Sequence, residues 1–169
     1  MPTTSARSLT ALRISVGCLF LIFAEYKVFG MQFTGGGGFQ YWINLFLQGG
    51  AYPFMVPVLK NFVLPHATLI AFVVAYGELA IGLSLVSGIS VRPASLCGMV
   101  YMLTLLFSSN YPGGNAPLWQ YLGASLDHSV LALCFGAFAL TNPEEMWSIR
   151  SLRRRTLLGQ KPGRENRIS

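Results

Sequence analysis

The chain has 169 residues, of which 53% are hydrophobic and 11% are charged. Its mean hydropathy of +0.51 exceeds that of an ordinary soluble domain, so the composition predicts one integral membrane domain and excludes a soluble enzyme. The net charge of +6 does not indicate a nucleic-acid partner, because the Lys and Arg residues gather near the chain ends and in one short turn instead of covering a folded surface.

The first predicted element is a spanning helix over residues 9–30, since about 20 apolar residues cross the hydrocarbon core of a bilayer. A cleaved signal peptide is the alternative interpretation, because Arg7 and Arg13 precede the apolar run. The run continues past Ala24 without a small-x-small cleavage motif. We therefore favour an uncleaved first span.

Two charged residues lie near the end of this first span. Glu25 and Lys27 are about 200° apart around a helix and cannot pair with each other. We expect Lys27 to reach the outer headgroups with its long side chain. Glu25 shares a helical stripe with Cys18 and Ile22, and we expect that stripe to face inward.

A long external loop over residues 31–65 follows, and its aromatic residues suit the headgroup layer. We predict a short interfacial helix over residues 39–47 and another over residues 57–63, neither long enough to span. The four glycines at positions 35–38 precede no GK[ST] sequence and follow no strand. We interpret them as a flexible linker and not as a phosphate loop.

The second predicted span, residues 66–87, carries one acid inside an apolar run. Ala71, Ala75, Glu78 and Gly82 follow helical spacing and form one face that is small except for the carboxylate. A charge at bilayer depth costs at least a few kcal/mol unless it is paired, protonated or hydrated. We therefore expect Glu78 to face the interior of the bundle.

The third predicted span covers residues 92–108, with Val91 as an alternative start and Tyr111 as its interfacial end. One helical stripe of this span is rich in hydroxyl groups: Ala94, Cys97, Tyr101, Thr104 and Ser108. Glu78 and Tyr101 come to nearly the same depth when each is measured along its own helix. We therefore predict a hydrogen bond between Tyr101 and Glu78.

The fourth predicted span covers residues 119–141 and brings in Asp127 and His128, roughly 10 Å below the outer surface and level with Glu25. Adjacent residues point about 100° apart on a helix, so Asp127 and His128 form no ligand pair, and we expect no metal site. The cysteines occur singly, without a CxxC spacing. No nucleophile–base or nucleotide motif appears.

The positive charges predict the orientation. Ten of the twelve Lys and Arg residues precede the first span, separate the second from the third, or follow the fourth, so both termini are expected in the cytoplasm. The expected organisation is an all-α four-helix bundle in the membrane, residues 1–145, with a long outer loop containing the interfacial helices. A basic tail, residues 146–169, follows and contacts anionic lipid, so the lipid bilayer is a partner.

Intramembrane ionisable groups are candidates for function. The alternative is that they neutralise one another and hold the helices together. The groups in question are Glu25, Lys27, Glu78, Asp127 and His128.

Three segments of the chain resemble the DoxX/DoxD-like membrane proteins, a family in which DoxD is a subunit of thiosulfate:quinone oxidoreductase. They are RISVGCLFLIFAEYKVFG, YGELAIGLSLVSGISVRPAS and NYPGGNAPLWQYLG. The resemblance covers most of residues 9–141. The fourth span departs from it, because it ends FALTNPEEM where many relatives carry a Gly-Arg-rich close.

The resemblance implies a four-helix protein of the bacterial inner membrane, linked to redox or sulfur metabolism, with quinone as the cofactor to expect. Under it, carboxylates and a histidine near the outer leaflet exchange protons as a quinone is reduced. The residues expected to line or tune that pocket are Glu78, Tyr101, Asp127 and His128, and further candidates for cofactor contact are Glu25, Lys27 and Arg92. Electrons would come from a membrane or periplasmic redox partner, because the sequence carries no flavin, haem or cluster motif.

Two other functions stay open at this point. The chain could be a noncatalytic scaffold or assembly subunit that binds other membrane proteins through its small-residue faces. It could also be a small transporter, although no inverted repeat and no Pro-broken span supports that.

Overall fold

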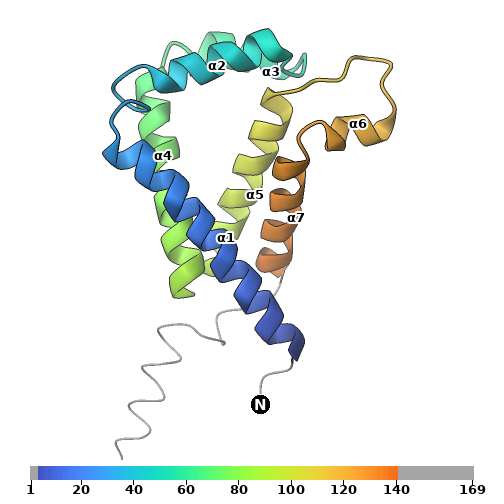
Figure 1. Ribbon diagram of the computed structural model, residues 1–169. Helices are drawn as coiled ribbons and strands as arrows, with labels where there is room; N and C mark the ends of the chain where they lie inside the picture. The colour runs from blue at the N-terminus through green and yellow to red at the C-terminus, as the bar shows by residue number, and fades with distance from the viewer. Residues whose placement is uncertain (1–3, 141–169) are drawn as a thin grey trace, which may run out of the picture.

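The computed structural model describes residues 4–140, and every regular element in that part of the chain is helical. The fourth predicted span's last residue, Thr141, and the basic tail 146–169 lie outside the described residues. The elements, shown in Figure 1, are α1 (Thr4–Phe29), α2 (Gly38–Gly49), α3 (Met55–Val58), the π-helical turn η1 (Leu59–Val63), α4 (Ala67–Ser87), α5 (Val91–Ser108), α6 (Leu118–Gly123) and α7 (Leu126–Leu140).

The bundle is built from two closely packed helix pairs, α1 with α4 and α5 with α7. Glycines allow the close approach in both pairs. A Cβ added at Gly82 of α4 would lie 2.8 Å from Leu21 of α1, and one added at Gly98 of α5 would lie 2.5 Å from the ring of Phe135 in α7. Small residues therefore serve packing within the chain, and α4 and α5 contact each other less closely.

Three helices are long and apolar enough to cross a membrane by length and composition, which confirms the first three predicted spans: Arg7–Phe29, Ala67–Ser87 and Val91–Ser108. The described part of the fourth, α7, is a 15-residue apolar helix of about 22 Å at 1.5 Å per residue. The expected continuous helix from Trp119 is wrong. The chain turns at positions 124–125, where Asn110 donates to the hydroxyl of Ser125 and so ties the end of α5 to the start of α7.

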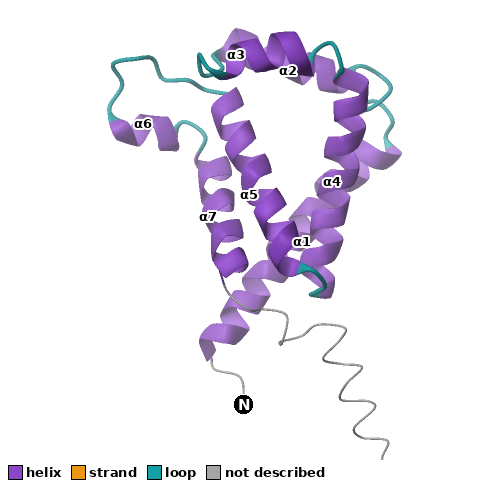
Figure 2. Ribbon diagram, turned by 180° about the vertical axis from the view of Figure 1, so that it is seen from behind, coloured by secondary structure: helices purple, strands orange, loops and turns teal. Residues whose placement is uncertain are grey.

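The loop between α1 and α4 closes one end of the bundle, which we call the loop end. The predicted interfacial helices are confirmed as helices: α2 covers residues 39–47, and α3 with η1 covers residues 57–63. Figure 2 shows α2 and α3 lying across the tops of α4 and α5. Apolar residues of α2, η1 and the segments beside them form a separate core with the start of α4, made of Phe33, Phe39, Ile43, Ala51, Leu59, Ala67 and Ala71.

The four glycines before α2 form a hydrogen-bonded turn and not the expected flexible linker. The amide of Gly38 donates to the carbonyl of Gln32 at 2.9 Å, and a Cβ at Gly38 would lie 2.8 Å from that oxygen. Gly37 has a φ of +80°, a backbone conformation that residues with a side chain rarely adopt. The turn therefore needs glycine for space and for backbone conformation, and it aims α2 across the bundle.

A tyrosine cluster, Tyr52, Tyr111 and Tyr121, ties the other side of the loop end together. The amide of Tyr52 donates to the carbonyl of Phe107 at 3.1 Å, and its hydroxyl donates to the carbonyl of Tyr121 at 2.8 Å. Burial raises the pKa of Tyr52 above 10.0, and Tyr121 and Tyr111 raise it further. The cluster connects the segment before α3 to the end of α5 and to α6.

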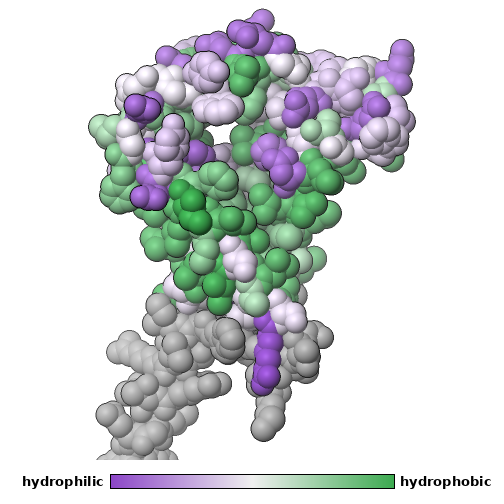
Figure 3. Space-filling model, viewed as in Figure 1, coloured by the Kyte–Doolittle hydropathy of each residue, from purple (hydrophilic) through white to green (hydrophobic). Residues whose placement is uncertain are grey.

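Hydrophobic residues cover the middle of the face shown in Figure 3, and hydrophilic residues gather at its loop end; we call this middle zone of the long helices the hydrophobic belt. Large apolar side chains are exposed on each long helix, among them Ile22, Val73, Val100 and Leu133, which are 60% to 75% exposed. Such a belt would be unfavourable in water and suits contact with acyl chains.

Candidate functional site

The acid at position 78 lies where the helical pattern places it. Glu78 is 5% exposed, and Ala71, Ala75 and Gly82 on the same face of α4 are also buried. The inward orientation predicted for this face is confirmed. The small residues let α1 approach closely, so a side chain from α1 reaches the carboxylate.

Glu78 forms a polar triad with Lys27 of α1 and Tyr101 of α5. The Nζ atom of Lys27 lies 2.5 Å from Oε1 of Glu78, and the hydroxyl of Tyr101 donates to the same oxygen at 2.5 Å. The predicted bond between Tyr101 and Glu78 is therefore confirmed. One carboxylate oxygen joins three helices.

The prediction that Lys27 reaches the headgroups is wrong. Its side chain is 16% exposed, and its ammonium lies 4.9 Å from the ring centre of Phe33 as well as against Glu78. A buried carboxylate attracts a nearby cation more strongly than a distant headgroup does, and the aromatic face adds to that attraction. Lys27 is thus the positive member of the site.

The second oxygen of Glu78 has no such partners. Oε2 is buried and accepts no hydrogen bond from any residue in the described range 4–140. A buried carboxylate oxygen without a donor costs free energy, and it remains able to accept a bond from water or from a ligand. The triad therefore has one satisfied face and one unsatisfied face.

A cavity of about 420 Å³ lies on one side of the triad, beneath α2, where Figure 3 shows the surface hollowed. Its polar lining groups are Lys27, Tyr101, Thr104, Ser108 and His128, and its walls are otherwise aliphatic and aromatic. The aromatic members of the wall are Phe23, Tyr26, Phe33, Phe39, Trp42 and Phe46. The loop between α1 and α4 therefore caps a pocket.

A smaller cavity of about 280 Å³ lies between α1, α4, α5 and α7. It is lined by Glu78 itself, and by Asp127, which does not line the larger cavity. The two cavities share Phe23, Lys27, Tyr101, Leu105 and His128. They therefore meet at the triad.

Asp127 and His128 join the site, but from the start of a helix and not from within the long helix that was expected to begin near Trp119. Because α7 begins at Leu126, Asp127 lies in its first turn, where the helix N-terminus favours a carboxylate, and its side chain is 72% exposed. His128 is 22% exposed. Its Nδ1 lies 3.5 Å from Oδ1 of Asp127 and makes no hydrogen bond within the described part of the chain.

Glu25 and Arg92 are not brought to the site. Glu25 is exposed together with Cys18 and Ile22, so the predicted stripe exists but points outward. The buried face of α1 is instead the one that leads to Lys27. Arg92 lies at the start of α5, where its Nε donates to the carbonyl of Ala139 in α7 at 3.2 Å.

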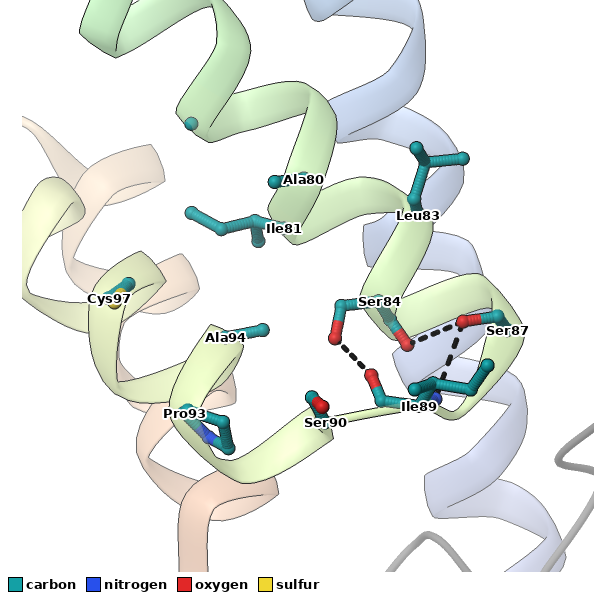
Figure 4. A pocket seen from close by; sticks show the side chains of 11 residues that line it. Ala80, Ile81, Leu83, Ser84, Ser87, Ile89, Ser90, Pro93, Ala94 and Cys97 are labelled. Carbon is teal, nitrogen blue, oxygen red and sulfur yellow. Dashed lines mark hydrogen bonds between the residues drawn. The ribbon is translucent and has the colours of Figure 1, made fainter. Parts of the chain in front are cut away.

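A third cavity, of about 550 Å³, lies at the opposite end of the bundle near the turn between α4 and α5 (Figure 4). Among the described residues, 4–140, no Asp, Glu, Lys, Arg or His lines it. Ala94 and Cys97 of the predicted α5 stripe line this cavity, whereas Tyr101, Thr104 and Ser108 line the cavity beneath α2. The stripe thus faces α4 across open space, and only its Tyr101 meets the acid.

Comparison with known proteins identifies a family. The DoxX family model matches residues 8–110, which include most of α1, the segment between α1 and α4, and all of α4 and α5. No curated protein and no solved structure matches the chain. Within the described residues, no three His, Cys, Asp or Glu side chains are placed to hold a metal ion. Lys27, Glu78 and Tyr101 all lie in the matched range.

Proposed function

The chain belongs to the DoxX family of membrane proteins, and we propose that it is the quinone-binding membrane subunit of an oxidoreductase complex in a bacterial inner membrane. One observation carries the proposal: a buried Lys–Glu–Tyr triad presents its Lys27 and Tyr101 to a largely apolar and aromatic cavity. That combination suits a ligand with a flat ring, two carbonyl oxygens and a hydrocarbon tail.

The triad has donors to offer a quinone carbonyl. Lys27 carries three N–H groups, of which Glu78 occupies one. The hydroxyl of Tyr101 lines the same cavity, but its one proton is donated to Glu78, so Lys27 is the member of the triad with donors left for the carbonyl. The aromatic side chains of the cavity wall would contact the ring face. Binding and orientation of the headgroup are the roles that we assign to Lys27 and these aromatic residues, and Tyr101 positions Glu78 beside Lys27.

The chemistry needs both electrons and protons, because a quinone becomes a quinol by taking up two of each. A membrane or periplasmic redox partner would supply the electrons. Glu78 and His128, at the junction of the two cavities, are the groups that we expect to hold protons. With both termini in the cytoplasm, as the positive charges favour, the loop end and the triad lie toward the periplasmic side.

The small-residue faces that suggested a scaffold are occupied inside the chain. Gly82 packs on Leu21 and Gly98 packs on Phe135. A partner helix would have to displace these contacts. We therefore favour ligand binding over scaffolding as the role of this bundle.

Trp42 in the cavity wall provides a direct test. A short-chain quinone added to the detergent-purified protein should quench tryptophan fluorescence saturably, and the saturable part should vanish in Trp42→Phe. Tyr101→Phe removes the hydrogen bond that holds Glu78, and with it Lys27, in place, and should weaken binding about fivefold, or about 1 kcal/mol. Tyr76→Phe, at an exposed tyrosine of α4, is the matched control and should bind as the wild type does.

Absence of saturable quenching, together with equal affinities for wild type and Tyr101→Phe, would contradict quinone binding in this cavity. A search for quinone in the lipid extracted with the protein gives a second, label-free test.

A further inference from the structure

We propose that the smaller cavity holds water and connects Glu78 to solvent at Asp127, so that it forms the proton-access side of the triad. This inference deepens the proposed function, because reduction of a quinone consumes protons. The larger cavity would then serve the ring, and the smaller cavity the protons. The presence of water beside Glu78 does not depend on which ligand the larger cavity binds.

The first support is the pair of buried polar atoms without hydrogen bonds in the described residues. Oε2 of Glu78 and Nδ1 of His128 are both buried and unbonded, and both side chains line the smaller cavity. Glu78 is more than nine-tenths buried. Orphaned polar atoms beside a cavity are the places where buried water is expected.

The second support is the room available. A water needs about 10–15 Å³ of accessible space and two to four polar partners, and the cavity offers about 280 Å³. Lys27 and Tyr101 line it beside Glu78 and His128, while Asp127 completes its polar set. Several waters can therefore bridge groups that no side chain bridges directly.

The third support is the position of Asp127. The break between α6 and α7 places this carboxylate in the first turn of α7, 72% exposed, and not a turn or more into a long span. His128 follows it directly, with Nδ1 at 3.5 Å from its carboxylate. The order from solvent inward is therefore Asp127, His128, cavity water and Glu78.

Every helix that borders this cavity contributes to its electrostatics. The charged or titratable groups that face Glu78 are Lys27 from α1, Tyr101 from α5, and Asp127 and His128 from α7. A proton that enters at Asp127 would pass by His128 and water to Glu78, and Glu78 would become a carboxylate again when it gives the proton to the reduced quinone. Two such transfers match two electrons from the redox partner.

Cysteine labelling tests the proposal without any quinone. In a variant with Cys18, Cys97 and Cys134 replaced by Ala, a charged methanethiosulfonate reagent is applied to membrane vesicles. The reagent reacts with thiolates in contact with water and spares thiols in hydrocarbon. Leu131→Cys lines the smaller cavity, and Leu133→Cys, on the same helix and 75% exposed on the belt, is the matched control.

We expect Leu131→Cys to react at least tenfold faster than Leu133→Cys. Met102→Cys, from α5 on the same cavity, repeats the test if Leu131→Cys does not fold. Equal, slow reaction at the cavity and control positions, while a membrane-permeant maleimide modifies both, would overturn the proposal.

The charge of the labelling reagent tests whether Asp127 lies at the solvent entrance of the smaller cavity. A carboxylate at the entrance should make cationic reagents faster than anionic ones at Leu131→Cys, and Asp127→Asn should lower that ratio severalfold. Glu25→Gln removes another exposed carboxylate, from α1, and should leave the ratio unchanged. An unchanged ratio in Asp127→Asn would refute Asp127 as the entrance.

The two proposals fail separately. Fast labelling without quinone-dependent quenching would leave a hydrated Glu78 in a protein that binds something else. Quenching without labelling would leave a quinone site whose protons arrive by another route.

Discussion

The two ends of the bundle hold cavities of similar size and opposite character. At the loop end, the cavities meet at a buried ion pair and at a carboxylate oxygen without a donor. At the other end, a cavity of about 550 Å³ is lined by small, apolar and hydroxyl-bearing residues. Volume therefore does not separate the two ends, and the buried carboxylate with one oxygen lacking a donor in the described part of the chain is the feature that marks the loop end as the candidate site.

The hydrogen bonds explain the difference. In the turn between α4 and α5, the hydroxyl of Ser84 donates to the carbonyl of Ile89, and the hydroxyl of Ser87 accepts from the amide of Ile89 (Figure 4). Ser84 and Ser87, which line that cavity, are therefore hydrogen-bonded locally. At the loop end, the carboxylate of Glu78 is buried, and among the described residues only one of its two oxygens is hydrogen-bonded. Water solvates a carboxylate strongly, so this burial costs free energy unless function or bound water compensates.

The largest expected effect is loss of the cation at the loop end. Lys27→Met leaves the carboxylate of Glu78 buried without its counter-charge, and breaking such a pair typically costs about 3–5 kcal/mol. We expect a loss of that order in the free energy of unfolding, measured by denaturant titration in mixed micelles. Lys27→Met with Glu78→Gln should recover much of it, and Arg92→Met at the opposite end should show no comparable loss. Equal losses of unfolding free energy in Lys27→Met and Arg92→Met would contradict the contrast between the two ends.

Tyr101→Phe is expected to cause the next largest loss in the free energy of unfolding. It removes one hydrogen bond to a charged group, worth about 1.5–3 kcal/mol, and leaves Lys27 in place. The same unfolding measurement should place this variant between wild type and Lys27→Met. Tyr76→Phe, which changes an exposed tyrosine of α4, should not differ from wild type. A loss as small as that of Tyr76→Phe would argue against the bond to Glu78.

Filling the cavities separates their roles. Val74→Trp places a large side chain in the cavity beneath α2 and should weaken quinone binding at least tenfold, or about 1.4 kcal/mol. Ala94→Leu fills space in the cavity at the other end and should leave binding unchanged. Val74→Trp adds a second tryptophan to the cavity, so its fluorescence would mix with that of Trp42. Binding is therefore measured with a radiolabelled quinone. The opposite pattern would move the ligand to the other end.

The smallest expected effect is at the tyrosine cluster. Tyr52→Phe removes a neutral hydrogen bond to the carbonyl of Tyr121, worth about 1 kcal/mol. Since the pKa of Tyr52 is raised in the folded protein, its stabilisation is present below pH 10.0 and is lost as the pH rises through the raised value. Alkaline unfolding of wild type and Tyr52→Phe should therefore converge at high pH. A constant difference at every pH would contradict this role.

The sequence predicted the features that follow from helical periodicity and depth. The spacing of Ala71, Ala75, Glu78 and Gly82 identified the buried face of α4, and rise per residue matched Glu78 with Tyr101. Both inferences depend only on geometry within a helix. They are confirmed because bilayer burial leaves a helix few ways to orient an acid.

The sequence did not predict which face of α1 is buried. Glu25 and Lys27 point in nearly opposite directions, so one of them had to face inward, and depth favours neither. Packing against α4 decides in favour of Lys27, which continues the buried row of Val16, Phe20 and Ala24 at helical spacing. The signal available in the sequence was the helical spacing of Val16, Phe20 and Ala24 with Lys27, in which the small Ala24 comes one turn before the lysine.

The start of α7 was also missed, for a different reason. Hydropathy averages over the Gly123 to Ser125 segment and cannot detect a turn stabilised by contacts with another helix. The bond from Asn110 to Ser125 is tertiary and 15 residues distant. The wrong position expected for Asp127 along its helix follows from it.

The charge state of Glu78 tests the triad most directly. The infrared spectrum of the wild-type protein in lipid minus that of Glu78→Gln, at neutral pH and without quinone, isolates the contribution of this side chain. We predict an ionised carboxylate band that shifts in Lys27→Met. A protonated carboxyl band that is indifferent to Lys27→Met would contradict the ion pair on which the site is built.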